Sequence, residues 1–136
     1  MRYQHIIVSL LLLITGTSTA FTQNKPANPI EGKWVLQQVF TTKEKISWSR
    51  KPELVINTKD KTVSGYDGCN VLMGKFRQSD NKTLRFESIT GTLKACAGNG
   101  PDLFLNALDQ TDHYRIRNGK LELLKGTKIL LRLSRK

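Results

Sequence analysis

The residues with the most distinctive chemistry in this chain are its two cysteines. Cys69 and Cys96 are 27 positions apart, far from the Cys-x-x-Cys spacing of redox motifs and zinc sites. In an oxidising compartment such a pair favours a structural disulfide, whose loop closure is worth roughly 3 to 4 kcal/mol in the loop-entropy model. Two separate buried thiols are the alternative. The spacing therefore points away from redox and metal chemistry.

Other groups that could do chemistry are few. His113 lies at the expected end of a helix, beside Asp112, where the helix dipole favours a cation. Asp109 and Asp112 are three positions apart and should be neighbours on the solvated face of that helix. The sequence contains neither a glycine-rich phosphate loop nor the histidines that a triad or zinc site would need. We therefore expect no catalytic residue, no metal and no cofactor, and a protein that is not an enzyme.

The N-terminus has the features of a secretory signal peptide, which we place at residues 1–20. Arg2 precedes an apolar run from Ile6 to Ile14, and small residues follow up to Ala20. The apolar run is nearer ten residues than the roughly 20 that span a bilayer, so we expect no transmembrane span after cleavage. Because no cysteine lies at the junction, we expect an exported protein, periplasmic or secreted, that is not a lipoprotein.

Signal removal leaves one domain. Residues 21–29 (FTQNKPANP) are polar and contain prolines, so we expect a flexible leader there and a single domain over residues 30–136. The chain has 22 Lys and Arg against 11 Asp and Glu, and loss of Arg2 leaves a net charge of +10. Such a charge suits anionic lipid or polysaccharide partners, and export makes nucleic acid an unexpected one. Basic residues spread over the solvated faces of strands are the other interpretation.

Alternation of apolar and polar residues predicts mainly strands. Period two over residues 32–40 places Trp34, Leu36 and Phe40 on one side of the first strand. Residues 54–66 read as a hairpin, and residues 114–124 form another around an Asn-Gly turn. Seven or so short strands of this kind favour a small closed or nearly closed antiparallel barrel, with a sandwich as the alternative.

One helix is expected, over about residues 101–112. Pro101 suits the first helical position, and Asp102 suits the positive end of the helix dipole. The apolar face consists of Leu103, Phe104, Ala107 and Leu108. The predicted fold class is therefore mainly β with a single α-helix.

Two motifs carry a resemblance to a known family. Residues 63–70 read VSGYDGCN, Gly74 follows, and residues 92–96 read TLKAC. Together with the opening Gly-x-Trp strand, they resemble the META domain family, also called HslJ-like after a bacterial heat-shock protein, from about Ile30 to Leu133. Departures from the family pattern are Lys94 for methionine, Phe76 for tyrosine and Asp102 for glutamate.

The resemblance implies a lipocalin-like antiparallel β-barrel with a helix, in proteins of the cell envelope linked to stress or drug tolerance, and it brings no established catalytic residue. The motif positions of interest, structural or binding, are Gly65, Asp67, Gly68, Cys69, Asn70, Gly74 and Thr92. Glycine and asparagine accept left-handed backbone conformations, and the Thr92 hydroxyl is expected to cap a backbone group in a turn.

Three functions follow as hypotheses. The leading one is a non-enzymatic envelope protein that binds a protein or another envelope component. The second is a carrier or sensor of a small apolar ligand inside the barrel, unless the inward residues fill the interior: Trp34, Leu36, Phe86, Phe104 and Leu123. The third is electrostatic docking on anionic lipid or polysaccharide.

Overall fold

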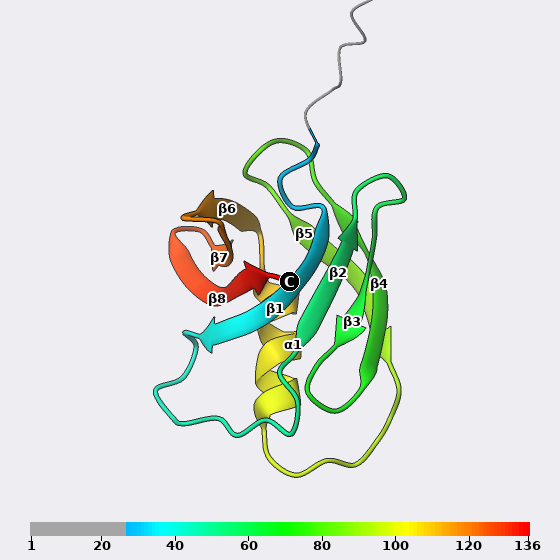
Figure 1. The fold of residues 1–136 in the computed structure, drawn as a ribbon, viewed down its shortest axis with the longest axis vertical. Coiled ribbons are helices and arrows are strands. Elements are labelled where there is room, and N and C mark those ends of the chain that lie inside the picture. Colours follow the sequence, from blue (N-terminus) through cyan, green and yellow to red (C-terminus); the bar gives the residue numbers. More distant parts are fainter. Residues whose placement is uncertain (1–26) are drawn as a thin grey trace, which may run out of the picture.

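The computed structural model describes residues 27–136 as eight strands and one helix (Figure 1). The expected signal peptide and most of the expected leader lie outside the described residues. In chain order the elements are β1 (Gly32–Val39), β2 (Glu53–Asn57), β3 (Thr62–Tyr66), β4 (Val71–Arg77), β5 (Arg85–Gly91), α1 (Gly100–Gln110), β6 (His113–Arg117), β7 (Lys120–Lys125) and β8 (Lys128–Arg135).

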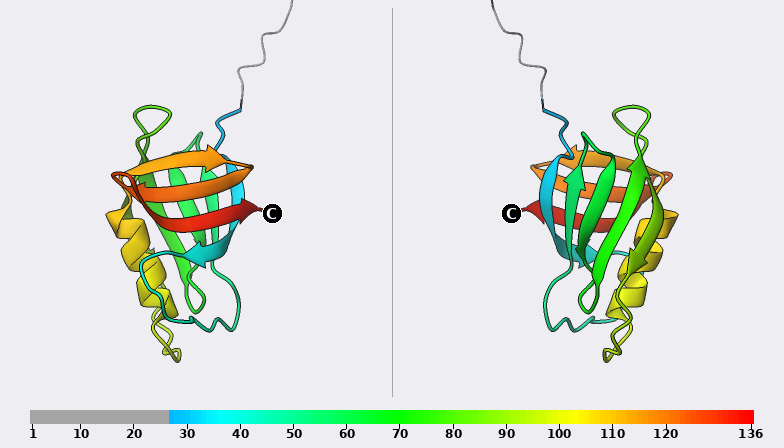
Figure 2. Two further views of the ribbon diagram at one scale, coloured as in Figure 1. Left: turned by 90° about the vertical axis from the view of Figure 1, so that its left-hand side faces the viewer. Right: turned by 90° about the vertical axis from the view of Figure 1, so that its right-hand side faces the viewer.

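All eight strands form one antiparallel sheet in the order β5-β4-β3-β2-β1-β8-β7-β6. Only the pairing of β1 with β8 joins strands that are distant in sequence. The sheet folds over on itself, so that β6, β7 and β8 cross β2, β3 and β4 with the core between them (Figure 2). The predicted class, mainly β with a single helix, is confirmed.

The predicted barrel is not confirmed, because within residues 27–136 no strand ladder joins the two edges of the sheet. The segment before β5 meets β6 through one bridge, between Thr83 and His113. Two backbone hydrogen bonds flank it, from Leu84 N to Asp112 O at 3.1 Å and from Tyr114 N to Lys82 O at 2.7 Å. Beyond this point the edges separate, and α1 packs against β5, β7 and β8 on that side (Figure 2).

A bulge in β1 interrupts the expected alternation of inward and outward side chains. Trp34 and Leu36 are buried as predicted, and the Trp34 indole donates to Ile30 O at 2.9 Å. The register with β8 shifts between Leu36 and Gln38, and Val39 packs against the core. The placement of Phe40 beside Trp34 and Leu36 was wrong, because the extra residue of a bulge reverses the faces that follow it.

The helix ends two residues earlier than predicted. Thr111 is extended, and its hydroxyl donates to Ala107 O at 2.7 Å. Asp112 already belongs to the sheet region, since its N–H donates to Leu124 O at 2.9 Å. Strand pairing therefore decides where the helix stops. Across residues 27–136, no helix is both long and apolar enough to cross a membrane.

A three-strand ion ladder stabilises the outer face of β6, β7 and β8. Arg115, Glu122 and Arg132 are directly opposite one another in register, and the Glu122 side chain is only 2% exposed. Arg132 donates to Glu122 Oε1 at 2.9 Å through Nε, and Arg115 donates to Oε2. Burial raises the pKa of Glu122, but the two guanidinium groups outweigh it and hold the pKa below its usual value.

The lowered pKa makes the ladder sensitive to acid. Its stabilisation is present above the pKa of an unfolded glutamate, about 4.3, and is lost as pH falls through the lower folded value. We expect Glu122→Gln to reduce the free energy of unfolding at neutral pH by about 1–3 kcal/mol, because it leaves two arginines without a carboxylate. Urea unfolding at several pH values should show this difference shrinking with acid.

Glu87→Gln is the matched control, because Glu87 pairs with Arg77 in an exposed position. Its effect should stay within about 1 kcal/mol. A constant difference between Glu122→Gln and the natural protein down to acid pH would contradict the ladder as the source of the pH dependence.

Candidate functional site

A buried carboxylate shapes the turn between β3 and β4, residues 67–70, which we name the Gly-Cys-Asn corner. Asp67 Oδ1 accepts hydrogen bonds from the backbone N–H groups of Cys69, at 2.8 Å, and Asn70. The Asp67 N–H in turn donates to Asn70 O at 3.0 Å, which closes the turn. Asp67 is fully buried, and its Oδ2 has no hydrogen-bond partner among the described residues. The carboxylate thus supplies the acceptor that the tight turn needs.

Trp48 packs against this corner and against the start of α1. Gly68 has φ +101°, and a Cβ there would come within 2.6 Å of the Trp48 ring. A Cβ on Gly100 would come within 2.5 Å of the same ring. Both glycines therefore leave room for the one tryptophan of the long loop before β2, and Gly68 also requires a backbone conformation that other residues rarely adopt.

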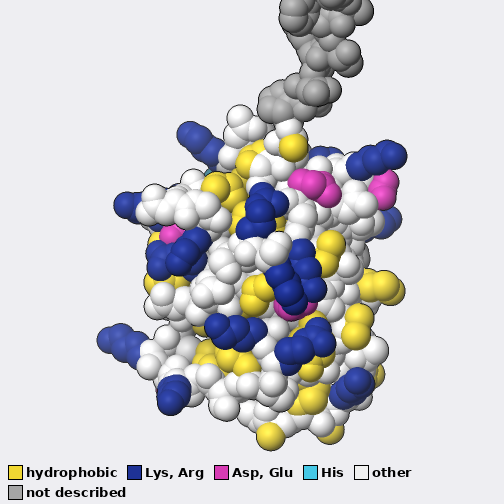
Figure 3. Space-filling model, in the orientation of Figure 1, with side chains coloured by type: hydrophobic (Ala, Val, Ile, Leu, Met, Phe, Trp, Pro, Cys, Tyr) yellow, Lys and Arg dark blue, Asp and Glu magenta, His cyan; other side chains and the backbone are white. Residues whose placement is uncertain are grey.

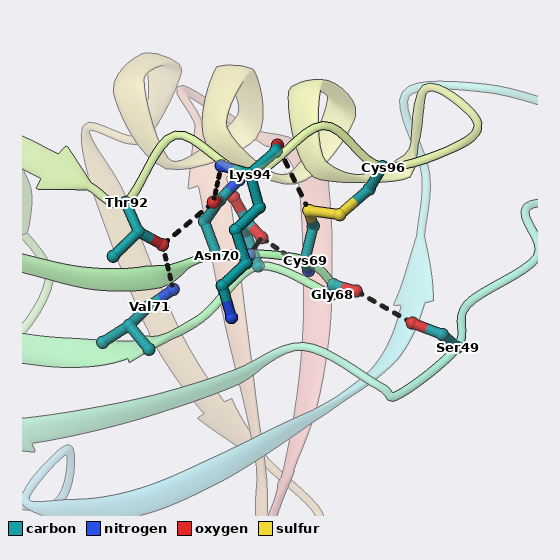
Figure 4. The surroundings of a disulfide bond; sticks show 9 residues. Ser49, Gly68, Cys69, Asn70, Val71, Thr92, Lys94 and Cys96 are labelled. Carbon is teal, nitrogen blue, oxygen red and sulfur yellow. Dashed lines mark hydrogen bonds between the residues drawn. A yellow bond between two sulfur atoms is a disulfide. The ribbon is translucent and has the colours of Figure 1, made fainter.

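The corner holds the exposed segment of residues 92–99, which we name the strap, by polar contacts. Asn70 Oδ1 accepts from Lys94 N at 2.7 Å and from the Thr92 hydroxyl at 2.9 Å (Figure 4). The Thr92 hydroxyl also accepts from Val71 N at 3.3 Å, so it does cap a backbone group. Asn70 therefore acts as a clamp on the strap.

The two cysteines add a covalent tie between the same two segments. Cys69 and Cys96 lie at disulfide-bonding distance, with their Cα atoms 6.1 Å apart, and are paired (Figure 4). Cys69 is buried, whereas Cys96 lies on the exposed strap. Within residues 27–136 no group of three or more His, Cys, Asp or Glu side chains is arranged to hold a metal ion.

The remaining motif residues lie apart from this cluster. Gly65 in β3 and Gly74 in β4 are sites of close strand packing, since an added Cβ would come within 2.0 Å of Glu53 O or 2.8 Å of the Ile89 side chain, respectively. The structure therefore brings Asp67, Gly68, Cys69, Asn70 and Thr92 together and leaves Gly65 and Gly74 in the sheet.

His113 and the predicted aspartate pair are placed differently from expectation. His113 opens β6, and its Nδ1 lies 2.6 Å from Asp112 Oδ1. This hydrogen bond is the main reason that the pKa of Asp112 is lowered. Asp109 and Asp112 are not helical neighbours, because α1 ends at Gln110, and Asp112 instead accepts from Gly126 N at 2.7 Å.

A groove runs between β5, the strap and α1, and sequence reasoning missed it. It consists of two adjoining depressions of about 430 and 400 Å³ that share Ile89 and Leu105. We name it the β5–α1 groove. Its lining residues are Asp67, Asn70, Leu72, Phe86, Ser88, Ile89, Thr90, Gly91, Thr92, Leu93, Lys94, Ala95, Pro101, Asp102, Leu105, Asn106 and Asp109.

The helix presents two different faces. Phe104, Ala107 and Leu108 are buried in the core. The spacing of Asp102, Leu105, Asn106 and Asp109 places them on a second face, which lines the groove. This second face was readable in the sequence as positions three, four and seven apart beside the apolar face.

The family model for the META domain matches residues 27–136. The chain belongs to the META domain family. The match spans every described strand, the helix, the Gly-Cys-Asn corner and the strap, so the resemblance seen in the sequence is confirmed. No curated protein matches the chain.

Solved structures share the fold of this META domain protein. A protein from Burkholderia xenovorans, solved by NMR, is 24% identical, with 93% of this chain and 99% of that chain covered and a TM-score of 0.60. A DUF4847 family protein from Bacteroides vulgatus is 14% identical, with coverages of 78% and 93% and a TM-score of 0.56. At these identities the likeness concerns the fold alone.

The disulfide between Cys69 and Cys96 should contribute measurably to the stability of this META domain. Cys69→Ala combined with Cys96→Ala should lower the free energy of unfolding by up to about 3–4 kcal/mol, because the unfolded chain regains the freedom of a 27-residue loop. Urea unfolding of the variant and of the natural protein measures the difference. Mass analysis of alkylated protein, with and without reduction, gives the thiol count, and two free thiols in protein purified under oxidising conditions would contradict the pairing.

Proposed function

We propose that this META domain protein is a non-enzymatic component of the cell envelope, periplasmic or secreted, that supports stress or drug tolerance by binding a partner. The partner is a protein or another envelope component. The proposal brings together the signal-like N-terminus, the family, and a groove beside the family's own motif. The single observation that carries it is the β5–α1 groove.

The groove has the composition of a recognition site. Its floor is apolar, with Leu72, Ile89 and Leu105, and its rim carries polar groups from the strap and the helix. The corner and the disulfide hold the strap that forms one wall. A tethered wall favours binding because little chain freedom is lost when a partner arrives.

A binding role also agrees with the structural contacts made by the titratable side chains. His113 is engaged by Asp112, and Asp67 organises a turn. Glu122 lies between two arginines. These side chains act as structural partners, which favours a protein that is not an enzyme and takes no cofactor.

The finer fold proposal is a lipocalin-like barrel in which the Thr83–His113 bridge and α1 complete the closure that a strand ladder would otherwise make. Side chains fill its interior, which argues against the transport of a ligand inside it. The five side chains that would line a ligand chamber belong to one hydrophobic cluster and are at most 8% exposed: Trp34, Leu36, Phe86, Phe104 and Leu123. We therefore rank the carrier of an apolar ligand below the binding protein.

A pull-down tests the leading proposal. The domain without residues 1–20 should retain a reproducible partner from envelope extract, and Asn106→Arg, which places a long charged side chain in the groove, should lose it. Gln38→Arg is the matched control, because Gln38 is an exposed polar residue of β1 outside the groove lining. Quantitative mass spectrometry reads the result. Failure to retain any reproducible partner, or equal retention by both variants, would count against the groove as the binding site.

Docking on anionic lipid is the second candidate, and a specific surface favours it. Leu93 on the strap is 100% exposed, and Met73 and Val71 on the outer side of β4 are 65% and 52% exposed. Lys75 and Lys94 stand beside them, and among the described residues neither forms an ion pair. Lys and Arg are also widespread on the face drawn in Figure 3. Apolar side chains next to lysines suit the boundary of an anionic bilayer.

Vesicle sedimentation tests this second candidate. We expect the domain to bind vesicles rich in phosphatidylglycerol, to release them in about 0.5 M salt because exposed charges are then screened, and to bind phosphatidylcholine vesicles weakly. Leu93→Asn should weaken binding several-fold, whereas Ile116→Asn, at an exposed apolar residue of β6, is the control. Binding that is independent of salt and of lipid charge would contradict it.

A further inference from the structure

The β5–α1 groove has a free strand edge on one side and a helix face on the other. β5 is the last strand of the sheet and pairs only with β4 along its length. Within residues 27–136 its opposite edge makes backbone hydrogen bonds only before the strand begins, where Leu84 N donates to Asp112 O, and α1 packs against β5. An edge strand presents backbone donors and acceptors that can pair with another strand. The groove thus offers backbone hydrogen bonding along one wall.

The helix wall supplies side chains at a matching spacing. Leu105 gives an apolar contact at the middle of the groove, where the two depressions meet. Asp102 and Asp109 stand one turn to either side, and both are exposed. An extended segment lying between β5 and α1 would place an apolar side chain near Leu105 and its flanking side chains near the two aspartates.

The charge of the groove is opposite to that of the protein. The chain carries twice as many basic as acidic residues, yet the charged side chains exposed along the groove are Asp102 and Asp109, with Lys94 as the one basic residue, since Asp67 is fully buried. Within residues 27–136, neither Asp102 nor Asp109 forms an ion pair. Complementary charge selects partners and suppresses wrong ones, so this groove favours basic segments and disfavours acidic ones.

We propose that the β5–α1 groove takes an extended segment of a partner protein, which adds to the edge of β5 as a strand and places basic side chains next to Asp102 and Asp109. The proposal rests on the proposed binding function and names its chemistry. β5 contains a bulge at Ser88, whose φ is +51°, so the added strand is short. Contacts with α1 must therefore contribute much of the affinity and the specificity.

Short synthetic peptides test the mode of binding directly. The probes are a seven-residue peptide of alternating valine and lysine, its valine–glutamate counterpart, and the valine–lysine peptide with alternate backbone nitrogens methylated. NMR titration of the isotope-labelled domain should show amide shifts in Phe86–Thr90 and in Asp102–Asp109 for the lysine peptide alone. The methylated peptide should fail because it lacks the N–H groups that an added strand must donate.

Charge variants test the side-chain half of the proposal. Asp102→Asn and Asp109→Asn should each weaken binding of the lysine peptide by about 2- to 5-fold, as expected for exposed ion pairs. Glu44→Gln is the matched control, because it removes one exposed carboxylate outside the groove and should leave the affinity unchanged. Because all three positions are exposed, thermal melting should confirm that each variant is folded.

The proposal would be overturned by equal binding of the lysine and glutamate peptides, by equal binding of the methylated peptide, or by shifts outside β5 and α1. Absence of any shift at millimolar peptide would overturn it as well. If envelope extract still yields a partner that Asn106→Arg releases, the proposed binding function stands and only the mode of binding fails. If the lysine peptide binds as described while the extract yields no partner, the groove chemistry stands and the envelope function fails.

Discussion

The hydrogen bonds of one buried carboxylate organise the part of the molecule from which its candidate site is built. Asp67 accepts from two successive backbone N–H groups and so turns the chain sharply between β3 and β4. That turn places Cys69 and Asn70 where they hold the strap by a disulfide and a side-chain clamp. The strap leads directly into α1, so the start of the helix is set by the corner. Replacing this acceptor would leave two N–H groups without a partner in a buried setting, which is costly.

The position of α1 is explained by the two open edges of the sheet. An eight-stranded antiparallel sheet that folds over without closing leaves two edges, and here they touch through a single bridge. The helix packs its apolar face on the core where the edges separate, which covers side chains that neither edge strand can cover. Its other face then looks onto the free edge of β5. The groove is therefore a direct consequence of an open sheet sealed by a helix rather than by another ladder.

Most acidic residues that form ion pairs lie on strands of the sheet. Glu53 is engaged by Lys33 and Lys136, Glu122 by two arginines, and Glu87 by Arg77, so these carboxylates neutralise neighbours within the sheet. In a chain with an excess of positive charge, such pairing leaves basic groups dominant over most elements. Asp102 and Asp109 in the groove form no ion pair among the described residues, and neither do Glu44 and Asp60 outside it. Under the proposed mode of binding, the basic surface would attract anions non-specifically, whereas the two exposed groove aspartates would select a basic segment.

Local pattern and tertiary pairing account for different parts of this structure. The alternation in the strands, the Asn-Gly hairpin, the helix with its apolar face and the motif pair around Cys69 and Cys96 were readable from the sequence, because each depends on neighbours a few positions away or on a family signature. The end of the helix, the bulge that turns Phe40 away from the core, and the open edge beside β5 were not. Each of these is decided by pairing between residues distant in the chain, such as Asp112 with Leu124 and β1 with β8. The sequence by itself therefore determined the elements and the family of this protein. Only the tertiary structure decided that Asp102 and Asp109 face a free strand edge, because that edge exists only where the folded sheet fails to close.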